Sequence, residues 1–283
     1  MWRGSVRPVS VSPVRPPAAW QPDPEPWDVR SLAATYRSGH RLPAHGHGWA
    51  QLVFARTGVM HVTAEGQVWL VPPTRAVWIP AGVQHGIEFR GEVALRTLYI
   101  APARAASIVP SVNDDGVRPA TDRGVHTLEV SPLLAALILH VLSLGMLDPG
   151  EPPQDRLAGV LTDLLAAAPR LDLALPLPTD PRALRFADLL RADPGARHDL
   201  DALAAHCGAS LRTIQRHVLE QTGMPLDSWR QKARLTHSVA LLAAGNSVAA
   251  AARDSGYDSP SAFTAAFRAH FGVPPRQFAR PAR

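Results

Sequence analysis

The sequence predicts an α+β multidomain protein with a β-rich N-terminal part, a helical middle segment and an all-helical C-terminal part. Short β-rich runs cut by turn residues fill residues 29–103, and apolar residues recur with helical spacing in 131–168. The excess positive charge lies in 181–283, which holds 14 Lys and Arg against 8 Asp and Glu. A chain of 283 residues is also long for one domain, so several domains are expected.

The composition is that of an ordinary globular protein, with 46% hydrophobic and 19% charged residues. The one cysteine, Cys207, excludes an intramolecular disulfide and is typical of a reducing compartment, so we expect a cytoplasmic location. A membrane helix needs about 20 consecutive apolar residues, and the sequence has no such run, so no membrane partner is expected. Every basic residue except Lys232 is arginine, which suits bidentate contacts with phosphate and guanine.

Residues 1–28 hold seven prolines and little apolar periodicity, which predicts a disordered, proline-rich leader. The strand-like part follows at 29–103. Its β-rich runs are separated by turn pairs such as Thr-Gly, Glu-Gly, Pro-Pro and Ala-Gly. Short strands at close spacing with turn signals predict a sandwich or a barrel.

The segment 104–179 is predicted to form a helical dimerisation region followed by a linker. Ser131 can cap a first helix in which Pro132 takes the first position, and a second helix is expected from about Gln154 to Ala168. The apolar stripes of these helices suit either the core of one chain or pairing with a second subunit. The proline-rich run "PRLDLALPLPTDP" at 169–181 reads as the linker.

The run "HDLDALAAHCGASLRTIQRHVLEQTGMP" has the pattern of a helix-turn-helix unit. Gly208 supplies a left-handed turn residue, and Ser210 caps the next helix. On that helix Arg212, Gln215 and Arg216 share the outer face, and these residue types can reach base edges in the major groove. An ordinary helical hairpin with a polar face would show the same pattern.

The pattern recurs in "NSVAAAARDSGYDSPSAFTAAFRAHFGVPP", where Gly256 marks the turn and a second outer helix begins near Pro260. Between the two units a long helix is expected over 226–244. Two such units joined by a stiff helix can present both outer helices to successive major-groove turns, which are about 34 Å apart.

Residues 180–283 resemble the DNA-binding domain of AraC/XylS-type transcription regulators, on "LAAHCGASLRTIQRHVLEQTGMP" and "VAAAARDSGYDSPSAFTAAFRAHFGVPPRQF". The resemblance implies two helix-turn-helix units that bind a double-stranded DNA operator. By position, the base-reading residues are Arg212, Gln215 and Arg216 in the first unit and Pro260, Ser261, Ala262 and Ala265 in the second. Arg234, Arg268 and Arg276 are expected to contact phosphates.

Two departures from the family pattern affect this prediction. Val218 stands where the family usually has phenylalanine, and the outer face of the second unit is small and nearly uncharged. Alanine and Thr264 can touch a thymine methyl group but cannot read guanine. The first unit is therefore expected to supply most of the hydrogen-bonded base readout.

The β-rich part resembles a cupin barrel. Gly39, His45, His47, Gln51 and Gly58 have the spacing of the first cupin motif, and the second motif is matched by Pro80, Gly82 and His85. Gln51 replaces the usual glutamate, Thr74 an expected glycine and Phe89 an expected asparagine.

This resemblance implies a sensor barrel in which His45, His47, Gln51 and His85 point inward. They could bind a divalent ion such as Ni, Zn, Fe or Mn, although the neutral Gln51 weakens the site. The barrel could instead hold an organic effector without metal, or serve only as a scaffold. Trp49, Trp69 and Trp78 are candidates to line the pocket or simply to fill the core.

The leading hypothesis is a homodimeric, sequence-specific transcription regulator, not an enzyme, whose barrel senses a metal ion or a small molecule. The alternative is a metal-dependent, dioxygenase-like cupin enzyme fused to a DNA-binding domain. An enzyme would need an acid or base beside the metal. Gln51 supplies no base, and the sequence does not place Glu65, Glu88 or Glu92 in the barrel.

Overall fold

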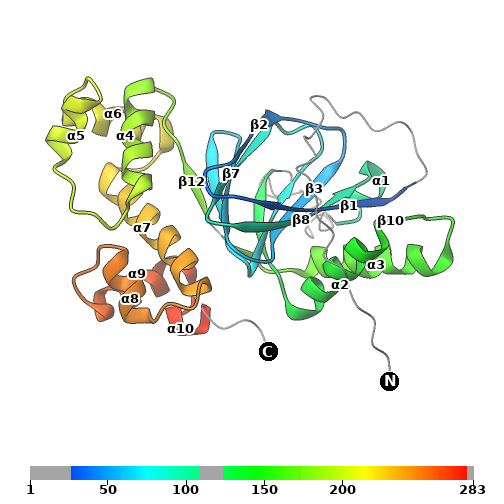
Figure 1. The fold of residues 1–283 in the computed structure, drawn as a ribbon. Coiled ribbons are helices and arrows are strands. Elements are labelled where there is room, and N and C mark those ends of the chain that lie inside the picture. The colour runs from blue at the N-terminus through cyan, green and yellow to red at the C-terminus, as the bar shows by residue number, and fades with distance from the viewer. Residues whose placement is uncertain (1–26, 109–123, 172, 279–283) are drawn as a thin grey trace, which may run out of the picture.

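The computed structural model describes residues 27–108, 124–171 and 173–278. It confirms the α+β multidomain prediction: a β-barrel that carries two helices lies beside a group of C-terminal helices (Figure 1). Of the predicted disordered leader, only Trp27 and Asp28 fall within the described residues. Asp28 forms an ion pair with Arg104, which also pairs with Asp155, so the start of the barrel is tied to a helix far along the chain.

Two antiparallel sheets form the barrel among the described residues. The first has the strand order β10 (Met146–Leu147), β1 (Val29–Tyr36), β8 (Val93–Ile100), β3 (Ala50–Ala55), β6 (Arg75–Ile79), β9 (His126–Glu129) and β11 (Arg170–Leu171). The second has the order β12 (Ala174–Pro176), β5 (Gln67–Val71), β4 (Val59–Ala64), β7 (His85–Arg90) and β2 (Arg41–His45). A short helix, α1 (Pro102–Ala105), follows β8.

The β-rich part does not end at residue 103, and the segment 169–181 is not simply a linker as predicted. β9 extends the first sheet beside β6, β11 pairs with β9, and β12 pairs with β5. The apolar residues of "RLDLALPLP" alternate with period two, and Leu173 and Leu175 are buried. The prolines made this run read as a linker, whereas short edge strands tolerate proline.

Strand β3 shows how the barrel has two apolar layers. Leu52 and Phe54 face outward and pack with α2 (Pro132–Leu144) and α3 (Pro152–Ala167). Val53 and Ala55 face inward and meet Met60 and Phe89 in the barrel interior. Because both faces of β3 are covered, all six of its residues are buried.

The two middle helices begin close to the predicted positions. The hydroxyl of Ser131 accepts a hydrogen bond from the Leu134 amide at 3.1 Å, and Pro132 takes the first helical position, so this predicted cap is confirmed. Helix α3 starts at Pro152, two residues before the predicted Gln154. Both helices cover the outer face of the first sheet (Figure 1).

The C-terminal helices form two similar units joined by one long helix (Figure 1). The first unit contains α4 (Pro181–Ala192), α5 (Leu200–His206) and α6 (Leu211–Thr222), and the second contains α8 (Val248–Asp254), α9 (Pro260–Phe271) and α10 (Pro275–Phe278). Helix α7 (Leu226–Ala243) connects them. Gly208 has the predicted positive φ, +78°, and Gly256 in the predicted second turn also has a positive φ, +77°.

Helix α7 also packs on the barrel. Its residues Leu235, Val239 and Leu242 share an apolar cluster with Leu70 of β5 and with Leu173. The indole N–H of Trp229 donates to the carbonyl of Pro176 at 2.6 Å. The second sheet therefore contacts the helix that joins the two C-terminal units.

Candidate effector site and nucleic-acid interface

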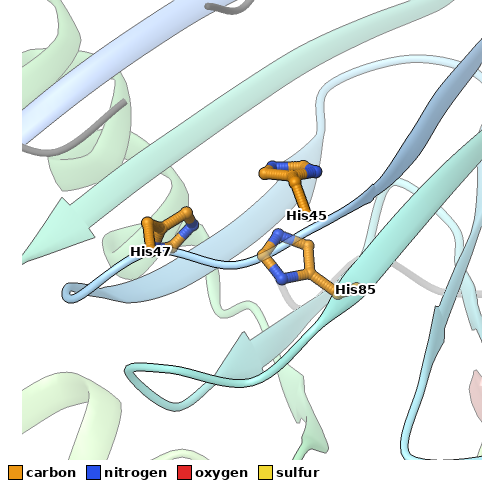
Figure 2. A group of neighbouring side chains, drawn as sticks. All are labelled: His45, His47 and His85. Carbon is orange, nitrogen blue, oxygen red and sulfur yellow. The ribbon is translucent and has the colours of Figure 1, made fainter. Parts of the chain in front are cut away.

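Three histidines meet at one end of the barrel. His45 ends β2, His47 lies in the following connection, and His85 begins β7, where it pairs with His45 (Figure 2). The ring centroids are 4.5 Å apart for His45 and His85, and 5.2 Å apart for His47 and His85. One ring nitrogen from each of the three lies within 4.8 Å of the others. Motif spacing therefore placed these three side chains together correctly.

Backbone carbonyls fix how the three imidazoles are protonated. The Nδ1 atoms of His45, His47 and His85 lie 3.0, 2.8 and 2.9 Å from the carbonyl oxygens of Pro43, Trp49 and Val83. A carbonyl only accepts hydrogen bonds, so each Nδ1 carries the proton and each neutral ring keeps its lone pair on Nε2. Metal-binding histidines are oriented by this same kind of hydrogen bond.

Gln51 lies beside the histidines on the inner face of β3. Its Oε1 is 3.1 Å from the Nε2 atom of His47, and its amide group donates to the Thr97 hydroxyl at 2.9 Å. Thr97 in turn donates to the Leu52 carbonyl at 2.9 Å. Because the Thr97 proton is used there, Thr97 accepts from the Gln51 amide, and the Gln51 carbonyl oxygen is left facing His47.

Burial favours the neutral forms of His47, His85 and Tyr99. It lowers the pKa of His47, and it lowers the pKa of His85 to about 4. Burial also raises the pKa of Tyr99, whose ring centroid is 5.1 Å from that of His47, to about 12. The Nε2 atom of His85 is buried and has no hydrogen-bond partner among the described residues. Neutral nitrogen and oxygen donors with an unsatisfied lone pair fit a divalent transition metal.

The other predicted barrel residues divide between the two faces. Trp69 lies in the barrel interior, whereas Trp78 packs in the layer below α2 and α3, so Trp78 does not line the barrel pocket. Trp49 is buried against the guanidinium of Arg30, 5.3 Å from its ring.

Two of the three glutamates considered for an enzyme site, Glu88 and Glu65, make contacts elsewhere. Glu88 pairs with Arg41 at 3.3 Å, on the opposite face of β7 from His85 and the barrel interior. Glu65 accepts from the amide of Val125 at 3.3 Å. The histidine group identified above contains no carboxylate among the described residues.

The first helix-turn-helix unit presents the predicted polar face. Ile214 and Val218 are buried, and Val218 fills the place where phenylalanine is usual. Arg212, Gln215 and Arg216 are exposed on α6. The hydroxyl of Ser210 accepts from the Thr213 amide at 3.2 Å, which confirms the predicted cap.

The second unit presents a small, nearly uncharged face. Phe263 and Phe267 are buried, while the predicted outer residues Pro260, Ser261, Ala262, Ala265 and Arg268 are exposed on α9. Thr264 is half-buried, and its hydroxyl donates to the Pro260 carbonyl at 2.7 Å. Its methyl group, rather than its hydroxyl, is left for a contact outside the helix.

Arg234 is not placed like a simple phosphate contact. It is half-buried on α7, and its Nε donates to the carbonyl of Pro194 at 3.0 Å. Its guanidinium carbon also lies 3.3 Å from the position that a Cβ on Gly256 would take. These contacts favour a structural role between the two units, whereas Arg268 and Arg276 are exposed.

Gly195 and Gly256 connect the two units by a close backbone approach that the sequence did not reveal. A Cβ on Gly195 would lie 2.2 Å from the Asp254 carbonyl oxygen, and a Cβ on Gly256 would lie 2.7 Å from the Gly195 carbonyl oxygen. Only glycine fits at such distances. The loop between α4 and α5 thus packs directly on the turn of the second unit.

Comparisons with known proteins match both parts of the chain. Residues 27–157 match the family described as AraC-like ligand binding domain, and residues 203–281 match the family described as helix-turn-helix domain. The HTH-type transcriptional regulator NimR of Escherichia coli is 31% identical over 236 residues, which cover 83% of this chain and 81% of NimR. The HTH-type transcriptional regulator RipA of Corynebacterium glutamicum is 35% identical over 103 residues, or 36% of this chain and 31% of RipA.

Among solved structures, unsaturated fatty acid bound wild-type ToxT from Vibrio cholerae is similar to this chain with a TM-score of 0.37 and 11% identity. That match covers 89% of this chain and 95% of ToxT. A transcriptional regulator of Chromobacterium violaceum, with an AraC-type DNA-binding domain, matches 36% of this chain and 91% of its own with a TM-score of 0.34 and 22% identity.

Proposed function

Since the chain belongs to the AraC family of transcriptional regulators, we propose that it controls transcription in response to a divalent transition metal held by His45, His47 and His85. The chain has a DNA-binding helix-turn-helix region and an AraC-like ligand binding domain, so the predicted family and the predicted regulatory function are confirmed. The proposed effector is the metal ion, and Gln51 is the fourth candidate metal ligand.

The observation that carries the proposal is the hydrogen-bonding pattern that the three imidazoles share. In each of them Nδ1 faces a carbonyl oxygen, which leaves a lone pair on Nε2. A bound divalent ion would supply a positive charge shared by these lone pairs. His45 and His85 come from the two paired strands β2 and β7. Ligands from both strands would therefore share the same ion at that end of the barrel.

An organic effector is the main alternative occupant. The same end of the barrel offers Tyr99, Gln51 and the histidines as hydrogen-bonding groups, and the interior behind them is apolar. Such a ligand would use the histidines as hydrogen-bond acceptors rather than as metal ligands. A metal effector predicts that a metal ion copurifies with the protein, whereas an organic effector does not.

The first test is elemental analysis of untagged protein, before and after incubation with Ni, Zn, Fe or Mn. We expect about one metal ion per chain, lost in a His45→Ala/His47→Ala variant and retained in His140→Ala, which removes an exposed histidine on α2. Operator binding with and without metal then tests whether metal is the effector. Protein that binds none of these ions would contradict the proposal and favour an organic effector.

We also propose that the protein acts as a homodimer through α2, α3 and β10. Leu133 and Val160 are 62% and 48% exposed on the two helices, and Met146 of β10 is 44% exposed. Exposed apolar side chains on three elements that contact one another support an interaction surface here. Leu133→Asp should convert the dimer into a monomer in sedimentation velocity, and an unchanged sedimentation coefficient would contradict this assignment.

The relatives are transcription regulators, which supports a regulatory rather than an enzymatic role. A cytoplasmic location is part of the proposal. Among the described residues, each helix is too short or too polar to span a bilayer. The enzyme alternative would be favoured if the full-length protein turned over a substrate and lost that activity in the His45→Ala/His47→Ala variant.

A further inference from the structure

The outer face of the second sheet carries apolar residues beside a few polar ones, and helix α7 packs on it. Along β4, Met60 and Val62 point into the barrel, so Val59 and His61 point away from it. On β5 the neighbouring Leu70 faces the same way, because it pairs with His61. This outer face packs against α7 instead of meeting solvent.

A cavity of about 270 Å³ lies between that face and the helices. The second sheet contributes six residues, α4 and the residues after it contribute two, and α7 with its C-cap supplies a row that includes several alanines. The residues that line the cavity include Val59, His61, Leu70, Arg90, Arg191, Pro194, Ala233, His237, Ala240 and Leu241. Small side chains at Ala233 and Ala240, one above the other on α7, leave the space open. Pockets for drug-sized ligands measure about 300–1,000 Å³, so this cavity suits a smaller molecule.

The polar groups that line the cavity are mostly cationic or neutral nitrogen groups. Arg90 comes from β7 and Arg191 from α4, and no carboxylate is among the lining residues. Arg191 has an ion pair with Asp188 of its own helix at 2.8 Å. Arg90 has no ion pair among the residues that the structure describes. Two arginines from two domains therefore share a mostly apolar space, with Asp188 and Glu88 as the acidic neighbours of Arg191 outside the lining.

His61 adds an unsatisfied polar atom to the same wall. Its Nδ1 is buried and has no hydrogen-bond partner among the described residues. Burial first, and then the charges of Arg90 and Arg191, lower the pKa of His61 well below its usual value. Burial also lowers the pKa of Arg191, although Asp188 and Glu88 oppose that change. A bound negative charge would relieve this crowding of positive charge.

We propose that this cavity is a second ligand site, which binds a small organic anion with one carboxylate and a compact apolar body. Arg90 and Arg191 hold the carboxylate, and Val59, Leu70 and Leu241 surround the apolar body. The site is separate from the histidine cluster, because His61 faces outward from the barrel and His85 faces inward.

Occupancy of this site links ligand binding to the placement of the DNA-binding region. Arg90 belongs to the barrel, whereas Arg191 and Pro194 belong to the first C-terminal unit. Pro194 accepts from Arg234 of α7, and the next residue, Gly195, packs on the second unit. A ligand that contacts both sides favours this arrangement over any in which the domains separate.

The test uses full-length protein and isothermal titration calorimetry with benzoate and hexanoate as probes. We expect at least one of the two anions to bind, and its neutral amide, benzamide or hexanamide, to bind about tenfold more weakly or not at all. Arg90→Gln should raise the Kd of the anion about tenfold. Arg56→Gln, which removes an exposed arginine elsewhere on the barrel, should leave it unchanged.

Two further variants locate the binding. Ala240→Phe should fill the cavity and abolish binding while thermal unfolding shows that the protein remains folded. The His45→Ala/His47→Ala variant should keep the wild-type affinity for the anion. The proposal is overturned if neither anion binds at millimolar concentration, if the amides bind equally well, or if the histidine variant alone loses binding.

Discussion

The Nε2 atom of His47 lies 3.1 Å from the Oε1 atom of Gln51. The Nδ1 proton of His47 is used by the Trp49 carbonyl, so two lone pairs face each other unless a proton or another cation lies between them. Burial lowers the pKa of His47 and so disfavours the additional proton. The contact is therefore better suited to two ligands of one cation than to a direct hydrogen bond.

Gln51→Glu should strengthen metal binding, because a carboxylate adds a negative charge at a position already directed at the histidines. We expect the Kd for Zn or Ni at pH 7 to fall about tenfold, measured by competition with a chelator. Gln51→Leu should raise the Kd by a similar factor. Gln67→Glu adds the same charge at the start of β5 and should have no effect. Equal affinities for the wild-type protein and all three variants would remove Gln51 from the ligand set.

Gly195→Ala should disturb both stability and DNA binding. The new methyl group would lie 2.2 Å from the Asp254 carbonyl oxygen, so the backbone of one unit must shift. Overpacking of this kind costs about 1–3 kcal/mol, and we expect the free energy of unfolding in urea to fall by about that amount. Operator affinity should fall further than stability explains, because the shift changes how the two outer helices are spaced.

Gly159→Ala is the matched control for that substitution. Gly159 lies within α3, and a Cβ there meets nothing within 4 Å. Replacing a helical glycine by alanine stabilises by about 1 kcal/mol, so the control should be at least as stable as the wild type. If Gly195→Ala behaved like Gly159→Ala, the backbone approach between the two units would not be a constraint in solution.

His61 should make stability depend on pH. Its pKa in the folded protein lies well below the value of about 6.5 that it has in the unfolded chain. As the pH falls below about 6.5, the unfolded chain takes up a proton that the folded protein does not, so the free energy of unfolding decreases. For one histidine the loss between pH 7 and pH 5.5 is about 1 kcal/mol.

The comparison with His61→Gln isolates this contribution. Burial lowers the pKa values of His85, His47 and His237 as well, so the wild-type protein and the variant share that background dependence. Urea unfolding in the presence of a chelator should show a smaller slope against pH for His61→Gln below pH 6.5. Identical slopes would mean that His61 takes up its proton as readily in the folded protein as in the unfolded chain.

Local signals in the sequence predicted the parts of the fold that depend on local chemistry. Ser131 and Ser210 cap helices where the sequence placed them, Gly208 adopts the predicted left-handed conformation, and Gly256 lies in the predicted turn. Each of these roles depends on neighbours within a few residues. The histidine positions were predicted because motif spacing encodes the pairing of β2 with β7.

Contacts between distant segments could not be predicted in the same way. β12 is three residues long and exists because β5 supplies its partner. Arg234 donates to a carbonyl 40 positions away, so its side chain looked like a free cation in the sequence. The interdomain cavity likewise depends on alanines of α7 meeting a sheet whose outer face has no local sequence signature.

Base readout should depend more on the first unit than on the second. Arg212 and Gln215 are exposed on α6 and can make bidentate contacts with guanine and adenine, each giving about 1–3 kcal/mol of discrimination. Arg212→Ala and Gln215→Ala should therefore relax sequence preference in a selection from random DNA. Ser261→Ala and Ala265→Ser, on the small face of α9, should change it less.

Arg268→Ala distinguishes base-specific contacts from the sequence-independent attraction of the protein to DNA phosphates. Arg268 is exposed near the end of α9, where we expect a phosphate contact. Its loss should weaken binding to all sequences by the same factor and reduce the dependence of log affinity on log salt by about 1. Sequence preference that relaxes more on changing Ser261 and Ala265 than on changing Arg212 and Gln215 would show that the second unit, despite its small side chains, is the principal reader.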